Sequence, residues 1–388
     1  MALIYIIVYV SSIGNPIVLP VLPDILKEFA ITPLEMSLLI SIYALPGMLV
    51  IPMYGFLSDR LGRRPLLLLG LFLCFIGSMV CYFATSYSWL LFGRALQGLS
   101  ITPLEALANT LTSDLFNGEE RMRMVTRVTV VQYFGIASVP LVISGLLMLG
   151  SWRLSFALAA SLGFFALIFC LPIKLAYTSA TASIQTFRKH LRELLFSRRV
   201  ISLLTLRATS ALILFGIVYV HFPLLFTERL PDATHLVGPI YSFYAVGMLV
   251  GSLLTTHVTC RFGATTPGYL GGSSLTLGLA LLVLLSAPWM GAIAMAMVGI
   301  GTALINSSTV GHISLATTPD TRGSIMSAYS TVFRAGQTVA PILCGMYFQM
   351  VGASWLFATG TILAIVLTLW ATATFRYANA MEHQSAPH

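Results

Sequence analysis

Apolar runs of about 20 residues recur from one end of the chain to the other, and each is long enough to cross a membrane as a helix. Of the 388 residues, 57% are hydrophobic and 9% are charged, whereas soluble domains carry about 25% charged residues. The runs are apolar on every face, which excludes barrel strands because those strands alternate apolar and polar residues. The pattern therefore predicts an all-α membrane protein.

The polar breaks between these runs predict twelve transmembrane helices. They cover approximately residues 3–23, 36–57, 65–84, 88–112, 125–148, 153–173, 201–226, 236–258, 266–286, 289–313, 324–347 and 353–375. One long basic break separates two sets of six. The predicted domains are an N-terminal six-helix bundle at 1–173, a cytoplasmic connector at 174–200, a C-terminal six-helix bundle at 201–375 and a cytoplasmic tail at 376–388.

Lysine and arginine are distributed unequally between the two sides that these spans define. With the connector in the cytoplasm, fifteen of them lie in cytoplasmic segments and three, Lys27, Arg153 and Arg229, lie on the opposite side. This bias predicts that both termini are cytoplasmic. The same loops account for the net charge of +8, so we expect the lipid bilayer, and no nucleic acid, as a partner.

The two halves of the sequence repeat at a constant offset of 201 residues. Arginine, glycine and proline positions match in corresponding loops and spans: Arg60 with Arg261, Gly62 with Gly263, Arg121 with Arg322, Gly135 with Gly336 and Pro140 with Pro341. Nearby offsets match Trp152 with Trp355 and Pro20 with Pro223. A parallel duplication of this kind predicts two pseudo-symmetric six-helix bundles, which is a layout found in transporters.

Several motifs carry a resemblance to a known family. They are GFLSDRLGRRP at 55–65, LLFGRALQG at 90–98, GNPIVLPVLP near the first span, DLFNGEER after the fourth and SWRLSF at the sixth. With them the chain resembles the major facilitator superfamily over essentially its full length, and within it the twelve-spanning drug:proton antiporter branch. The resemblance implies the major facilitator fold in a bacterial cytoplasmic (inner) membrane, without a cofactor. We expect a monomer.

Two positions depart from that branch. The stretch VPLVISG keeps Pro140 and Gly145 but lacks the paired glycines, and Pro16 stands where many relatives carry an acidic residue. Export and a usual proton carrier are therefore less firmly implied than the fold.

The resemblance gives the 55–65 loop the role of a conformational latch on the cytoplasmic side. Asp59 is expected to cap the start of the helix near Ser324, where backbone N–H groups and the positive end of the helix dipole are exposed. Arg63 and Arg64 are expected to pair with Asp114. The predicted latch residues are Gly55, Asp59, Arg60, Gly62, Arg63, Arg64 and Asp114. A positive-inside anchor is the alternative, and it explains the arginines but not Asp59.

Ionisable side chains inside spans are costly and indicate function. Glu105 is the acid deep within a span, eleven residues after Arg94 on one face of the same predicted helix and about 16 Å along its axis. We expect both to act in proton coupling: Glu105 carries the proton and Arg94 links its protonation to conformation. Alternatively, Glu105 is a fixed partner for an arginine on another helix.

Other polar and aromatic side chains within spans are candidates for substrate binding. These candidates are Asn15, Tyr43, Gln132, Tyr133, Tyr219, Tyr244, Asn306, Phe333, Arg334 and Gln337. Arg207 is expected to extend to the cytoplasmic surface. His221 and His312 lie near predicted helix ends and are expected to face water.

These features predict a proton-coupled secondary active transporter that exports a small amphiphilic or drug-like molecule by alternating access. The sequence holds no GxxxxGK[ST] phosphate loop, so ATP is not expected to drive it. No catalytic triad and no metal-ligand spacing is found, so neither an enzyme nor a metal site is expected. The alternatives are uptake or facilitated transport of a neutral or anionic metabolite, favoured by three arginines against one acid in the spans, and a non-transporting membrane sensor on the same fold.

Overall fold

The computed structural model describes residues 1–116, 118–173, 198–315 and 319–385. Within these ranges it describes the backbone alone at 51–61, 314–315, 319–324 and 375–385 and at scattered positions that include Asp114. The described residues form helices and turns without strands. Eight of these helices are long and apolar enough to cross a membrane. The chain divides into two compact units, whose described parts are 1–173 with His235–Ser242 (unit 1) and 198–234 with 243–385 (unit 2). The predicted connector lies mostly outside the described residues.

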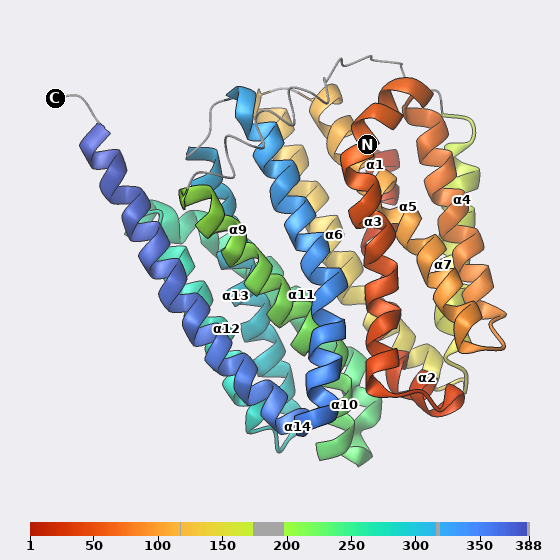
Figure 1. Cartoon of the computed structure of the whole chain (residues 1–388). Coiled ribbons are helices and arrows are strands. Elements are labelled where there is room, and N and C mark those ends of the chain that lie inside the picture. Colours follow the sequence, from red (N-terminus) through yellow and green to blue (C-terminus); the bar gives the residue numbers. More distant parts are fainter. Residues whose placement is uncertain (117, 174–197, 316–318, 386–388) are drawn as a thin grey trace. The chain divides into compact units, whose positions relative to one another are not determined.

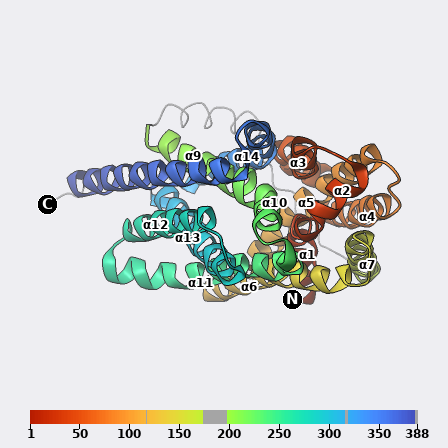
Figure 2. The same cartoon turned by 90° about the horizontal axis from the view of Figure 1, so that it is seen from below.

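Unit 1 contains the first six predicted spans. Its elements are α1 (Ala2–Ser12), η1 (Leu19–Val21), α2 (Leu22–Phe29), α3 (Pro33–Leu61), α4 (Arg63–Tyr82), α5 (Tyr87–Leu115), α6 (Gly118–Leu147) and α7 (Arg153–Cys170). Both views place α4 beside α7 (Figures 1 and 2). Apolar side chains of α1, α4, α5 and α7 form a shared buried core that includes Ile7, Leu71, Leu107 and Cys170.

The predicted first span, 3–23, is not one continuous helix. α1 ends at Ser12, and turns follow, in which the N–H of Ile17 donates to the carbonyl of Ile13 at 3.0 Å and the N–H of Val18 to that of Asn15 at 3.0 Å. Pro16 and Pro20 lack the N–H that a helical ladder needs, so the helix breaks here. The apolar pattern alone did not reveal this break.

Unit 2 contains the last six spans. Its elements are α9 (Arg198–Ala211), the π-helix η2 (Leu212–Tyr219), α10 (Val220–Arg229), most of α11 (Val237–Phe262), α12 (Thr266–Val283), α13 (Pro288–Leu315) and α14 (Pro319–Ser385); η3 (Pro231–Leu236) precedes α11. Figure 2 shows α12 beside α13. The element α14 covers the last two predicted spans. Gly352, with φ 78°, interrupts the helix between them. The prediction of an all-α membrane protein with twelve spans in two pseudo-symmetric six-helix bundles is confirmed.

The 201-residue repeat extends to individual backbone contacts. A Cβ added to Gly98 on α5 would lie 2.0 Å from the carbonyl oxygen of Tyr43 on α3, and one added to Gly299 on α13 would lie 2.1 Å from that of Tyr244 on α11. Both pairs are 201 residues apart. At these points the two backbones touch, which only glycine permits. The duplication is therefore visible in the packing as well as in the sequence.

A polar clamp in unit 1 joins three elements near their ends. Arg153 at the start of α7 pairs through Nη2 with Glu28 Oε1 at 2.7 Å and donates to the carbonyl of Ala84 at 3.0 Å. The neighbouring Trp152 donates its indole N–H to Glu28 as well. We call Glu28, Arg153 and the Ala84 carbonyl the unit 1 clamp. It ties α2 and the end of α4 to α7.

Unit 2 has an equivalent clamp, in which the arginine stands at the position equivalent to Glu28 and not at the one equivalent to Arg153. Arg229 at the end of α10 donates to the carbonyl of Leu285 at 3.3 Å and to Ser354 Oγ at 2.8 Å. Arg229, Leu285 and Ser354 each stand 201 residues after Glu28, Ala84 and Arg153. Trp355 does not repeat the environment of Trp152, since it is 68% exposed and Trp152 is 4% exposed.

Candidate functional site

A network around Arg94 on α5 is the main polar feature inside unit 1. The side chain is fully buried, at 0% exposure. Its Nη1 donates to the carbonyl of Gly14 and to Gln97 Oε1, both at 2.8 Å, and its Nη2 donates to Asn15 Oδ1 at 3.1 Å. Its Nε donates to a carbonyl of α3 at 3.3 Å. The guanidinium carbon lies 4.2 Å from the ring centroid of Tyr43.

The partners of Arg94 in the described residues are neutral acceptors and an aromatic ring. Burying a charge is costly unless hydrogen bonds satisfy it, and bonds to a charged donor are stronger than neutral ones. The break after α1 supplies one acceptor, because Gly14 lies outside the helical ladder. A Cβ at Gly14 would lie 1.7 Å from Tyr43 Oη, so a larger residue there would displace the Tyr43 ring that packs on Arg94. The network thus fastens α5 to α3 and to the broken first span.

The space beside this network is small. A cavity of about 10 Å³ is lined by residues that include Gly14, Tyr43, Ser78 and Gln97, which is room for about one water molecule. Gln97 donates to Ser78 Oγ at 2.7 Å. Asn15 and Tyr43, predicted as substrate contacts, are held by Arg94, so the geometry here suits a connection between helices.

Glu105 lies three turns along α5 from Arg94 and is half-buried. It is not among the partners of Arg94. The residue 201 positions later is Asn306 on α13. Two further substrate candidates, Gln132 and Tyr133, lie half-buried on α6, and their predicted role is untested.

An aromatic cluster gathers several predicted substrate residues in unit 2. Its members are Phe215, Tyr219, Tyr244, Tyr329 and Phe333. The ring centroid of Phe215 lies 5.2 Å from that of Phe333 and 5.1 Å from that of Tyr219. The centroids of Tyr219 and Tyr244 are 5.7 Å apart. These rings come from η2, α11 and α14. Because tilted and edge-on pairs at such distances attract, Phe215, Tyr219, Tyr244 and Phe333 form one connected and largely buried aromatic group. Tyr329 joins this group through Arg207, which lies over its ring and that of Phe333.

Cationic and amide groups border this cluster. The guanidinium carbon of Arg207 lies 3.6 Å from the ring centroid of Phe333 and 4.6 Å from that of Tyr329. Tyr329 donates to Asn306 Oδ1 at 2.6 Å. Arg334, which is buried, donates to Gln337 Oε1 at 3.0 Å. The structure thus brings Asn306 and three predicted aromatic residues together.

Three members of this site were missed as candidates. Phe215, Tyr329 and Arg207 were not predicted to bind substrate, and Arg207 was expected to extend to the cytoplasmic surface instead of stacking on rings. The four-residue spacings of Phe215 with Tyr219 and of Tyr329 with Phe333 were an available signal, since residues four apart share a helix face.

The expectation that His221 and His312 face water was wrong. They are 0% and 2% exposed. The Nδ1 atom of each ring lies close to a carbonyl of the preceding turn, at 2.7 Å from Gly216 for His221 and at 2.8 Å from Ser308 for His312. A ring whose polar atom bonds locally can enter an apolar interior.

Most side chains of the predicted latch lie outside the described residues. For Gly55, Asp59, Arg60 and Asp114 the structure describes the backbone alone. Gly62 caps the start of α4 with φ 79°, and Arg64 donates to the carbonyl of Leu171 at 2.7 Å. Arg63 begins α4. The latch and its pairing with Asp114 stay predictions.

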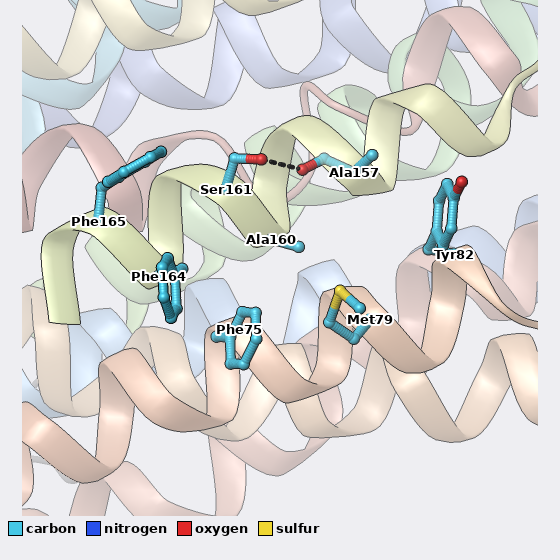
Figure 3. A pocket seen from close by; sticks show the side chains of 8 residues that line it. All are labelled: Phe75, Met79, Tyr82, Ala157, Ala160, Ser161, Phe164 and Phe165. Atoms are coloured by element: carbon cyan, nitrogen blue, oxygen red, sulfur yellow. Dashed lines mark hydrogen bonds between the residues drawn. The ribbon is translucent and has the colours of Figure 1, made fainter. Parts of the chain in front are cut away.

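Figure 3 shows a separate crevice of about 360 Å³ between α4 and α7. It is lined by Phe75, Met79, Tyr82, Ala157, Ala160, Ser161, Phe164 and Phe165. The Ser161 hydroxyl donates to the carbonyl of Ala157 at 2.8 Å. The lining has no charged side chain and none of the predicted site residues, so it is distinct from the aromatic cluster.

Comparison with known proteins gives the family. The profile described as Major Facilitator Superfamily matches residues 2–295 and 233–386. A bacillibactin exporter of Bacillus subtilis strain 168 is 34% identical over 116 residues, 29% of each chain. The quinolone resistance protein NorA of Staphylococcus aureus is 25% identical over 186 residues, 48% of this chain and 47% of NorA. The aligned segments thus span less than half of these relatives.

Solved structures share the fold at low sequence identity. The nucleoside transporter NupG matches with a TM-score of 0.79 and 14% identity over 97% of this chain and 99% of that one. The human organic anion transporter MFSD10 matches with a TM-score of 0.69 and 16% identity over 95% and 98%. These structures show the fold, and the profile match over nearly the whole chain establishes that the chain belongs to the Major Facilitator Superfamily.

Proposed function

We propose that this transporter is a proton-coupled exporter of small amphiphilic molecules that works by alternating access in a bacterial cytoplasmic membrane. Two relatives named for export and for drug resistance support the direction. The fifteen-to-three distribution of lysine and arginine supports cytoplasmic termini. We further propose that it works as a monomer.

The aromatic cluster of unit 2 carries the proposal for substrate binding. The rings offer apolar faces to an amphiphilic molecule, while Asn306 on α13 accepts a hydrogen bond from Tyr329 and Arg334 follows Phe333 directly on α14. Binding sites in general combine apolar and aromatic walls with a few polar groups. Gln132 and Tyr133 on α6 are proposed as further contacts.

The comparison of the two halves supports a special role for Glu105. The equivalent position in unit 2 is Asn306, so a six-helix unit of this type does not need an acid there for packing. An acid retained inside a span despite its cost indicates a function. We therefore propose that Glu105 binds the transported proton and that Arg94 keeps α5 in place while it does so.

Charge in the spans also favours an anionic substrate as a second candidate. The spans contain three arginines, Arg94, Arg207 and Arg334, and one deep acid, Glu105. The guanidinium of Arg207 lies over rings of the cluster. A guanidinium next to an aromatic face suits a flat molecule that bears a carboxylate. Uptake or facilitated transport of such a metabolite is the alternative function.

Purified protein in liposomes tests the proposal. A pH gradient would be imposed, and the movement of the cation ethidium and the anion carboxyfluorescein would be followed by fluorescence. Accumulation of at least one dye that a protonophore abolishes is expected. If a dye exchanges through the protein but no gradient drives it, proton coupling is wrong.

A further inference from the structure

The helix that leads into His221 has an unusual backbone. Residues Leu212–Tyr219 form a π-helix, and α10 follows with Pro223 inside it. Proline has no N–H to donate to the preceding turn, and membrane helices often re-satisfy the freed groups by local π geometry. π-Helical turns are frequent at functional sites. This segment is therefore a point where α9, η2 and α10 can change their hydrogen bonding.

His221 projects into this irregular segment as a neutral base. Its Nδ1 lies 2.7 Å from the carbonyl of Gly216, and because a carbonyl can only accept, Nδ1 must carry the hydrogen. Nε2 is then the proton acceptor of the ring. That atom is buried and has no hydrogen-bond partner in the described part of the chain. The ring face stacks on Phe348 of α14, with centroids 4.8 Å apart.

The groups packed around the ring do not favour a positive charge. Helix α14 packs against both η2 and α10, and it presents Phe348 to the ring and Cys344 to Gly216. On the same helical segment the nearest titratable side chain is Tyr219. No carboxylate is among these groups, so a proton on Nε2 would have no acceptor here and would be costly to bury.

The charged groups of the neighbouring turns are farther away. Glu228 and Arg229 follow about two turns later on α10, and Arg229 belongs to the unit 2 clamp. Arg207 on α9 precedes His221 by fourteen residues, and Arg334 precedes Phe348 by fourteen, roughly 20 Å along each helix. Protonation of His221 therefore depends mainly on whether water reaches the ring.

We propose that His221 is a second proton-binding residue of the transport cycle, neutral while this segment is packed and protonated when the segment between the π-helix and Pro223 opens to water. Hydronium in the entering water gives up the proton and becomes water as the Nε2–H bond forms. This bond breaks, and the proton returns to a water molecule as hydronium, before the segment packs again. The inference rests on the proposed proton coupling. His312 shares the local Nδ1 contact, but α13 has neither a π-helix nor a proline near it.

Gradient-driven transport tests the inference. His221→Asn removes the base while its amide N–H can still donate to Gly216. The matched control is His312→Asn, another buried histidine with the same kind of local bond. Both variants and the wild type would be assayed for carboxyfluorescein and ethidium uptake under a pH gradient from pH 5 to 8, and for exchange of dye for dye without a gradient. Labelling with ¹⁵N-histidine would report the protonation of each ring by NMR.

Loss of about tenfold or more in gradient-driven uptake by His221→Asn, with a flattened pH profile and near-normal exchange, is the expected result. His312→Asn is expected to keep the wild-type pH profile. If the wild type is gradient-driven and His221→Asn keeps its full drive and pH profile, the inference is overturned. If no gradient drives the wild type, the proposed function fails instead. If His221→Asn does not fold, the NMR measurement on the wild type decides. A His221 ring that never gains a proton, as the pH is lowered and substrate is cycled, overturns the inference.

Discussion

The two clamps predict that the unit 2 arrangement can be transplanted into unit 1. Glu28 and Arg153 correspond to Arg229 and Ser354 at the 201-residue offset, and both guanidiniums bind the carbonyl at the same relative position, Ala84 or Leu285. The single substitution Glu28→Arg would place two positively charged guanidiniums next to each other, where they repel. Adding Arg153→Ser should recreate the unit 2 geometry and restore much of the lost stability.

The size of the effect follows from the contacts. Glu28 and Arg153 are 40% and 30% exposed, so solvent screens their ion pair, which should contribute at most about 1 kcal/mol. The carbonyl bond and the stacking of Arg153 on Trp152, 4.4 Å from the ring centroid, together add about 1–2 kcal/mol. Glu28→Arg should therefore destabilise unit 1 by about 1–2 kcal/mol, or a few degrees in Tm. The double variant should recover at least half of this loss.

Thermal unfolding of the purified variants in detergent measures this effect, with Arg153→Ser alone completing the double-mutant cycle. The pH dependence provides a second check. The hydrogen bond and charge of Arg153 lower the pKa of Glu28. The ion pair therefore stabilises the protein above the usual pKa of a glutamate and is lost as the pH falls through the lowered value. The Tm difference between wild type and Glu28→Gln should shrink at acid pH. Additive losses in the double variant, with no recovery, would refute the equivalence of the clamps.

Two pairs of variants test the polar network and the packing. Arg94→Lys keeps the charge but cannot reach the Gly14, Gln97 and Asn15 acceptors together, so transport in vesicles should fall nearly as far as in Arg94→Ala; near-normal transport by the lysine variant would show that only charge matters. Gly98→Ala places a Cβ 2.0 Å from the Tyr43 carbonyl and should cost about 1–3 kcal/mol in thermal unfolding. Gly145→Ala, which meets no atom within 4 Å, is its control and should not lower the Tm.

Apolar periodicity and the repeat were sufficient to predict the spans, because a membrane forces each span to satisfy its own backbone, but they did not predict the break in the first span or the π-helix in the seventh. The break between 324–347 and 353–375 falls at Gly352, where the chain needs a left-handed residue. Positions such as Gly62 and Gly263 repeat for the same reason, with φ of 79° and 91°.

The partners of the polar side chains were not predictable in the same way. Arg94 binds carbonyls of Gly14 and Leu39, and every residue has a carbonyl, so the sequence carries no sign of which one is chosen. The interruption of the first span exposes one of these acceptors. Likewise, the burial of His221 depends on Phe348, more than one hundred residues away. Tertiary packing, which residue types alone do not specify, decides these contacts.

We propose that protonation of Glu105 drives transport in this member of the superfamily. Glu105→Gln removes the titratable group at a position where the other half of the protein carries the amide of Asn306. Reconstituted in liposomes, this variant should lose dye accumulation driven by a pH gradient and keep dye-for-dye exchange, because exchange needs no net change in protonation. Full gradient-driven accumulation by Glu105→Gln would show that Glu105 does not bind the transported proton.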